Sequence, residues 1–85
     1  MKTFSYTIQD ELGLHARPAG LLAKVAKATG SRITIQKGDK TVAADRLLSL
    51  MGLGIRHGDT ILVCIEDGDE AASMATMQDF FEKNL

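Results

Sequence analysis

Cysteine is nearly absent from this sequence, because Cys64 is the only one in 85 residues. A single cysteine cannot form an intramolecular disulfide, and no second thiol is available for a cysteine cluster of the kind that holds zinc. The sequence therefore excludes the disulfide-stapled secreted domains, and it indicates neither a metal nor a cofactor. This cysteine usage suits a reducing cytosol, so we expect a cytoplasmic protein.

Long hydrophobic runs and an excess of one charge are also missing. The first residues contain neither the apolar run of a signal peptide nor the roughly 20 apolar residues of a membrane span, so we expect no export and no membrane insertion. Ten Lys and Arg residues against eleven Asp and Glu residues give a formal net charge of -1. The overall basic charge of nucleic-acid binders is absent, so we expect no nucleic-acid partner.

The length of 85 residues fits one small domain and leaves no room for a separate cofactor lobe. Apolar residues make up 45% of the chain and charged residues 25%, which is close to the globular average and argues against a disordered tail. We therefore expect residues 1–85 to form a single domain. We also expect the protein to be a monomer.

Periodicity and turn signals predict seven elements. The strands are expected over residues 3–8, 32–36, 40–44 and 60–66, with Gly38-Asp39 as a two-residue hairpin turn. The helices are expected over residues 16–29, from 45 or 46 to about 52, and after a cap at Asp69. The order β-α-β-β-α-β-α predicts an α+β two-layer sandwich with the helices on one face of an antiparallel sheet.

A histidine, an arginine and a proline lie together at the predicted start of the first helix, in the segment GLHARPA at 13–19. Pro18 suits the first turn, where its missing N–H costs nothing. The free amides of Ala16 and Arg17, the positive end of the helix and the Arg17 guanidinium should converge near the His15 ring and form an anion site for phosphate or carboxylate. The same positive field disfavours the imidazolium form, and a neutral imidazole can attack phosphorus.

A less specific interpretation is that His15 is only a helix cap and Arg17 only a surface residue, because short motifs often occur without function. The small size of the chain instead favours a chemical role for His15. A chain this small cannot enclose a catalytic pocket, so its function should rest on a surface nucleophile and a partner.

The sequence resembles HPr, the histidine-containing phosphocarrier of the bacterial sugar phosphotransferase system, along its whole length. GLHARPA is similar to the active-site signature of that family, while Lys40-Thr41-Val42 and Leu53-Gly54-Ile55 fall at spacings similar to its second and third landmarks. The resemblance implies an open-faced sandwich of four antiparallel strands and three helices.

The resemblance also implies a reaction. His15 would accept a phosphoryl group on its Nδ1 atom from enzyme I, itself charged by phosphoenolpyruvate, and deliver it to the IIA domains of sugar permeases. Arg17 would compensate the phosphoryl charge, so the protein would be a carrier with a phosphohistidine intermediate and not an enzyme. Two rival functions stay open: a regulatory HPr-like protein that acts mainly by binding partners, and a small ligand-sensing or interaction domain without phosphoryl chemistry.

The predicted short helix is apolar almost all round, although a helix on a sheet can bury only one face. Leu50 and Leu53 suit the buried side. The remaining apolar side chains would be either core residues or an exposed docking patch for these partners, and the resemblance favours docking; they are Leu47, Leu48 and Met51. The cations that could rim such a patch and attract acidic partners are Lys24, Lys27 and Arg46.

Three further residues, Gly20, His57 and Cys64, could have a functional or a purely structural role. Gly20 lies inside the first helix at a cost of about 1 kcal/mol relative to Ala, and it could either flatten the surface near His15 for a partner or relieve packing. His57 is expected in a turn, because no carboxylate stands at ligand spacing to make a metal site with His15. Cys64 should lie on the open side of the sheet as a semi-exposed, non-catalytic thiol.

The clearest departure from the HPr pattern is Arg46. In HPr proteins of many Gram-positive bacteria, this position is a serine that a dedicated kinase phosphorylates. Arginine cannot accept the phosphoryl group, and Ser49, the nearest hydroxyl, comes about one helical turn later. We therefore predict no seryl phosphorylation by that kinase.

Overall fold

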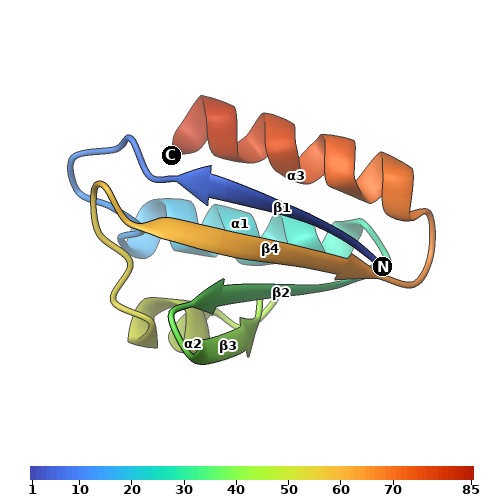
Figure 1. Ribbon diagram of the computed structural model, residues 1–85, viewed down its shortest axis with the longest axis horizontal. Helices are drawn as coiled ribbons and strands as arrows, with labels where there is room; N and C mark the ends of the chain where they lie inside the picture. Colours follow the sequence, from blue (N-terminus) through green and yellow to red (C-terminus); the bar gives the residue numbers. More distant parts are fainter.

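The computed structural model describes residues 1–85 and contains the predicted elements in the predicted order (Figure 1). The strands are β1 (Lys2–Thr7), β2 (Arg32–Lys37), β3 (Lys40–Ala43) and β4 (Thr60–Glu66). The helices are α1 (Ala16–Ala28), α2 (Leu47–Gly52) and α3 (Glu70–Asn84). None of these helices could cross a membrane, since the longest has 15 residues.

The four strands form one sheet in the order β1-β4-β2-β3, and every neighbouring pair is antiparallel. Lys37 pairs with Lys40, so the predicted turn at Gly38-Asp39 joins β2 to β3. Because β4 lies between β1 and β2, the two strands nearest the ends of the sequence are neighbours in the sheet. Figure 1 shows the sheet in front of α1.

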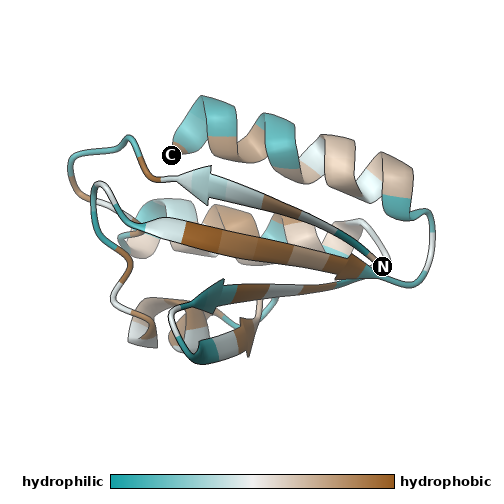
Figure 2. Cartoon of the chain, viewed as in Figure 1, coloured by the Kyte–Doolittle hydropathy of each residue, from teal (hydrophilic) through white to brown (hydrophobic).

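Side chains alternate across β4, the strand with two long neighbours. Ile61, Val63 and Ile65 are buried, whereas Leu62 and Cys64 are half-buried on the other face. Figure 2 shows hydrophobic colour along most of this strand. The predicted α+β fold, with the helices on one face of an antiparallel sheet, and the predicted position of Cys64 are confirmed.

The first two helices bury apolar residues at helical spacing. Of the four such residues that the sequence offers in α1, Ala19, Leu22 and Ala26 are buried and Val25 is half-buried. The helix ends before Gly30, whose φ of 75° is the left-handed conformation that glycine tolerates. Beside α2, Leu50 and Leu53 are both buried.

The third helix begins at the predicted cap. The Asp69 carboxylate accepts a hydrogen bond from the Ala72 N–H at 3.1 Å. Phe81 is fully buried, and its ring centroid lies 5.9 Å from that of Phe4 and 5.3 Å from that of Tyr6. These aromatic contacts pack α3 against β1 and bring the end of the chain back toward its first loop.

Candidate functional site

His15 occupies the N-cap position of α1. Its backbone is extended, with φ of -86° and ψ of -177°, and the Ala19 N–H donates to the His15 carbonyl at 3.0 Å. The half-buried side chain, however, makes no capping hydrogen bond. His15 is therefore the helix cap through its backbone, as the less specific interpretation predicted, but its imidazole does not take part in capping and is free for another role.

The first turn of α1 has two free backbone donors. Neither Ala16 nor Arg17 donates a backbone hydrogen bond, and Pro18 has no N–H to donate. The positive partial charge of the helix end adds to these amides. Such a helix end favours a phosphate or carboxylate.

An open hollow of about 340 Å³ adjoins this helix end, and we call it the His15 hollow. Its lining residues are Asp10, His15, Arg17, Pro18, Leu21, Lys83 and Asn84. Arg17 is exposed and forms none of the ion pairs of the molecule, so its guanidinium has no carboxylate partner. The structure thus brings together the two side chains that the motif predicts for an anion site.

Four residues of the His15 hollow were not predicted from the sequence: Asp10, Leu21, Lys83 and Asn84. Asp10 comes from the loop after β1, and the last two come from the final turn of α3. The Asp10 N–H donates to the Leu85 carbonyl at 2.8 Å, and the Gln9 N–H donates to the same oxygen. This contact joins two distant segments, and no pattern in the local sequence indicates it.

Gly13 lies two residues before His15 and packs directly against the backbone of the loop 54–58. Its φ is 65°, and an added Cβ would lie 2.5 Å from the Ile55 carbonyl oxygen and 2.7 Å from the Arg56 Cα atom. The neighbouring Leu14 N–H donates to the same Ile55 oxygen at 3.1 Å. Only glycine fits both the conformation and the space, so the loop 54–58 fixes where α1 begins.

An ion pair between Lys37 and Asp59 holds the loop 54–58 in place. The Lys37 ammonium donates to the Gly54 carbonyl at 2.7 Å and lies 3.0 Å from the Asp59 carboxylate. Asp59 also accepts a hydrogen bond from the Arg56 N–H at 2.8 Å. The bond from Arg56, followed by that from Lys37, lowers the pKa of the Asp59 carboxyl below its usual value.

Three apolar side chains of α2 are exposed: 40% of Leu47, 84% of Leu48 and 42% of Met51. We call them the α2 patch. The alternative that these residues belong to the core is wrong. The patch is small and contains a flexible methionine, which is typical of a surface that meets more than one partner.

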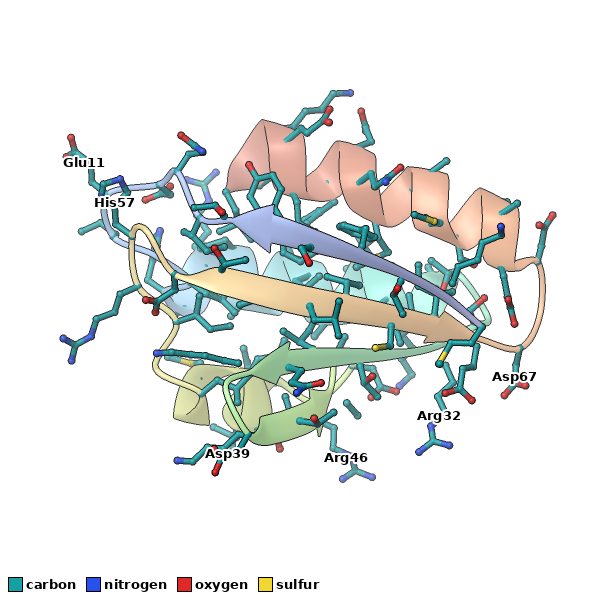
Figure 3. The ribbon with its side chains drawn as sticks, in the orientation of Figure 1. Glu11, Arg32, Asp39, Arg46, His57 and Asp67 are labelled. Carbon is teal, nitrogen blue, oxygen red and sulfur yellow. The ribbon has the colours of Figure 1, made fainter.

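The three cations predicted to rim the α2 patch lie on two different helices. Lys24 and Lys27 are exposed on α1 and form no ion pair. Arg46 is the N-cap residue of α2 and lines a second hollow of about 190 Å³ together with Arg32 and Ala26. Figure 3 shows both arginines pointing away from the same edge of the molecule. Arg46 directly precedes Leu47 of the α2 patch, whereas Ala26, which lines the same hollow as Arg46, lies about 16 Å along α1 from His15.

The alternatives for Gly20 and His57 can be separated. Gly20 is half-buried, and a Cβ added there would meet no atom within 4 Å, so the packing explanation is wrong. His57 is exposed on the loop before β4, and Figure 3 shows it at one end of the molecule. It does not line the His15 hollow.

Comparisons with known proteins show which family the chain and its fold resemble. The family model described as PTS HPr component phosphorylation site matches residues 2–83. The phosphocarrier protein HPr of Mycoplasma genitalium is 35% identical over 85 residues, covering 99% of this chain and 97% of that protein. A crystal structure of HPr-C-His from Thermoanaerobacter tengcongensis is similar with a TM-score of 0.92 and 32% identity, covering 98% of this chain and 93% of that one.

A longer protein contains a similar segment. The multiphosphoryl transfer protein of Xanthomonas campestris pv. campestris is 36% identical over 75 residues. The match covers 88% of this chain but only 9% of that protein.

Proposed function

The chain belongs to the HPr family of phosphotransferase system phosphocarriers, and from this premise we propose that His15 takes a phosphoryl group from enzyme I and passes it to the IIA domains of sugar permeases. Members of the family carry the group as a phosphohistidine and are not catalytic enzymes. One observation carries the assignment to His15: its uncapped ring shares a hollow with the unpaired Arg17, at a helix end with two free amides.

The chemistry is a phosphoryl exchange between two nucleophiles. The lone pair of His15 Nδ1 forms a bond to phosphorus while the bond from phosphorus to the donor group of enzyme I breaks, and its electron pair stays on the donor. The amides of Ala16 and Arg17 would donate to the phosphoryl oxygens, and the Arg17 guanidinium would bind two of them. The helix fixes the two amides before the phosphoryl group arrives, so these donors need no reorganisation. In delivery, a nucleophile of the IIA domain forms a bond to phosphorus while the bond from phosphorus to His15 Nδ1 breaks, and its electron pair returns to the imidazole.

The α2 patch supports the proposed docking. A carrier must bind two partners in turn and leave quickly, which favours a small surface with few ion pairs. The exposed Leu47, Leu48 and Met51, with Lys24 and Lys27 on the adjacent helix, provide apolar contacts and an attraction for acidic partners. A similar segment within a longer multiphosphoryl transfer protein fits a unit that works beside other phosphoryl-carrying units.

A regulatory protein that acts mainly by binding partners is the second candidate. It would use the same α2 patch without transfer. His15 and Arg17 are both present and share the hollow, which favours the carrier.

The free thiol of Cys64 suits a reducing cytoplasm, where we place the protein as a monomeric carrier of one domain.

Labelling with enzyme I and labelled phosphoenolpyruvate tests the acceptor. The protein should take up one phosphoryl group that is lost in mild acid but survives alkali. His15→Ala should abolish the label. His57→Ala is the matched control, because this exposed histidine lies outside the His15 hollow, and it should keep the label. Label that persists in His15→Ala would overturn the assignment.

A charge in the α2 patch tests the docking. Met51→Glu should slow transfer from enzyme I about tenfold or more, because it places a carboxylate in a desolvated contact. The melting temperature should fall by no more than a few degrees, since the side chain is already 42% exposed. Gln78→Glu adds the same charge at an exposed position of α3 and should leave transfer unchanged. If Met51→Glu instead lowered the melting temperature by many degrees, slower transfer would reflect lost stability, and the docking role of Met51 would be refuted.

A further inference from the structure

The His15 hollow lacks sufficient positive charge for a phosphoryl group if only the predicted residues act. A phosphoryl group carries between about 1.5 and 2 negative charges near pH 7. Arg17 supplies one positive charge, and the end of α1 adds roughly half a charge. Asp10 also lines the hollow and contributes a negative charge of its own. A further cation would balance this sum, and only one is present in the hollow, Lys83.

Lys83 is held near His15 through its backbone. It lies in the last turn of α3, where the neighbouring Leu85 carbonyl accepts the Asp10 N–H at 2.8 Å and the buried Phe81 fixes the helix to the sheet. Figure 1 shows this end of α3 close to the loop that follows β1, away from the N-terminal residue of the chain. The Cα position of Lys83 is therefore set by tertiary contacts, and its side chain need not organise the fold.

The tip of Lys83 is held only weakly. Its ammonium lies 3.2 Å from the Asp79 carboxylate one turn earlier, and the two side chains are 71% and 60% exposed. Exposed pairs of this kind contribute little, because water solvates both partners. A lysine also has a flexible four-carbon stem and three donor hydrogens, so it can change partners without moving its backbone.

We propose that Lys83 is a second phosphoryl-binding cation, which turns from Asp79 to the phosphoryl oxygens when His15 is phosphorylated. The inference rests on the proposed function, since it assumes the group on His15. No covalent step involves Lys83: it donates hydrogen bonds while the bond between phosphorus and nitrogen forms and breaks at His15. Its effect is to stabilise the phosphorylated protein relative to the free protein.

The equilibrium constant for phosphoryl transfer between enzyme I and the protein tests this role. It depends on the relative stability of the free and phosphorylated protein and not on the rate of docking. Lys83→Gln should shift it away from the phosphorylated protein by about threefold to tenfold at low salt, and less at high salt. Lys83→Arg, which keeps the charge, should restore most of it. Asp79→Asn releases the lysine from its present partner and should shift the equilibrium the other way.

The control for net charge is Lys2→Gln, at the opposite end of β1 from the loop that leads to His15. It removes one positive charge and should leave the equilibrium unchanged. If Lys83→Gln takes up label but has the same equilibrium constant as Lys2→Gln, then Lys83 only stabilises the helix end and the inference fails, while the proposed function stands. If the unmodified protein takes up no label, the proposed function itself fails.

Discussion

The N-termini of α1 and α3 are built in opposite ways. At α3, the Asp69 carboxylate accepts from the Ala72 N–H at 3.1 Å, so the chain itself supplies the anion that a helix start favours. At α1, the His15 side chain makes no capping bond and the amides of Ala16 and Arg17 have no backbone partner. One helix start is complete within the fold, and the other has free donors, which the proposed phosphoryl site would use.

Within one small domain, the capped start of α3 contributes to stability, whereas the uncapped start of α1 serves the proposed function. An acidic N-cap stabilises a helix by about 1 kcal/mol, and α1 gives up that contribution. A carboxylate at this position would occupy the Arg17 amide and repel a phosphoryl group. The open start of α1 is therefore the property that a phosphoryl acceptor requires, and the capped start of α3 shows that the sequence can provide the alternative.

His15→Asp should have the largest effect on activity, because it would convert the start of α1 into one like that of α3. Phosphohistidine formation should be lost completely. Stability should rise by less than about 1 kcal/mol, since Pro18 offers no N–H and the new carboxylate can reach only the amide of Arg17. Labelling by enzyme I and thermal unfolding measure the two outcomes. A melting temperature lower by many degrees would show that the His15 ring supports the fold.

Gly13→Ala should have the largest effect on stability, because it would displace the start of α1 from its support. The new Cβ would lie 2.5 Å from the Ile55 carbonyl oxygen, so the backbone must shift, and we expect a loss of about 2 to 4 kcal/mol with slower phosphorylation. Gly54→Ala is the matched control. Its φ of 63° is similar, but its Cβ would meet no atom within 4 Å, so it should lose only about 1 kcal/mol. Equal losses in thermal unfolding would contradict the role of Ile55.

These two glycines also show how far the sequence alone leads. Spacing predicts α1, turn chemistry predicts the hairpin at Gly38-Asp39, and a short motif predicts that His15 and Arg17 lie together, because all three depend on neighbours in the sequence. The contact of Gly13 with Ile55 depends on how distant segments meet.

Lys83 also lines the His15 hollow because distant segments meet there: α3 packs on β1, and the last turn of α3 binds the loop at Asp10. Periodicity indicates which face of α3 is buried, yet it gives no sign of which exposed residue ends beside a distant histidine. Local rules thus predict the elements and the motif, while the complete lining of the site requires the tertiary structure.

Asp69→Ala should show the converse of His15→Asp. Removing the cap of α3 should lower the free energy of unfolding by about 1 kcal/mol, which corresponds to roughly 4 to 8 °C in melting temperature for a domain of this size. Phosphorylation of His15 should be unchanged, because Asp69 does not line the His15 hollow. Asp69→Asn retains a capping side chain and should recover most of the stability. A drop in labelling with either variant would mean that the two helix starts are coupled.

The start of α2 is a third case, and there we expect the smallest effect. Its N-cap residue is Arg46, whose side chain makes no capping bond and whose charge opposes the helix dipole by about 0.3 to 1 kcal/mol. In HPr proteins of many Gram-positive bacteria, a kinase phosphorylates a serine at this position. Ser49 cannot replace it well, because it is half-buried and lies within the helix and not at its exposed start. Incubation with that kinase and ATP should therefore add no phosphate that mass spectrometry detects, whereas Arg46→Ser, which restores the hydroxyl at the helix start, should be phosphorylated. Phosphoserine at Ser49 would overturn this expectation and would leave the assignment of His15 intact.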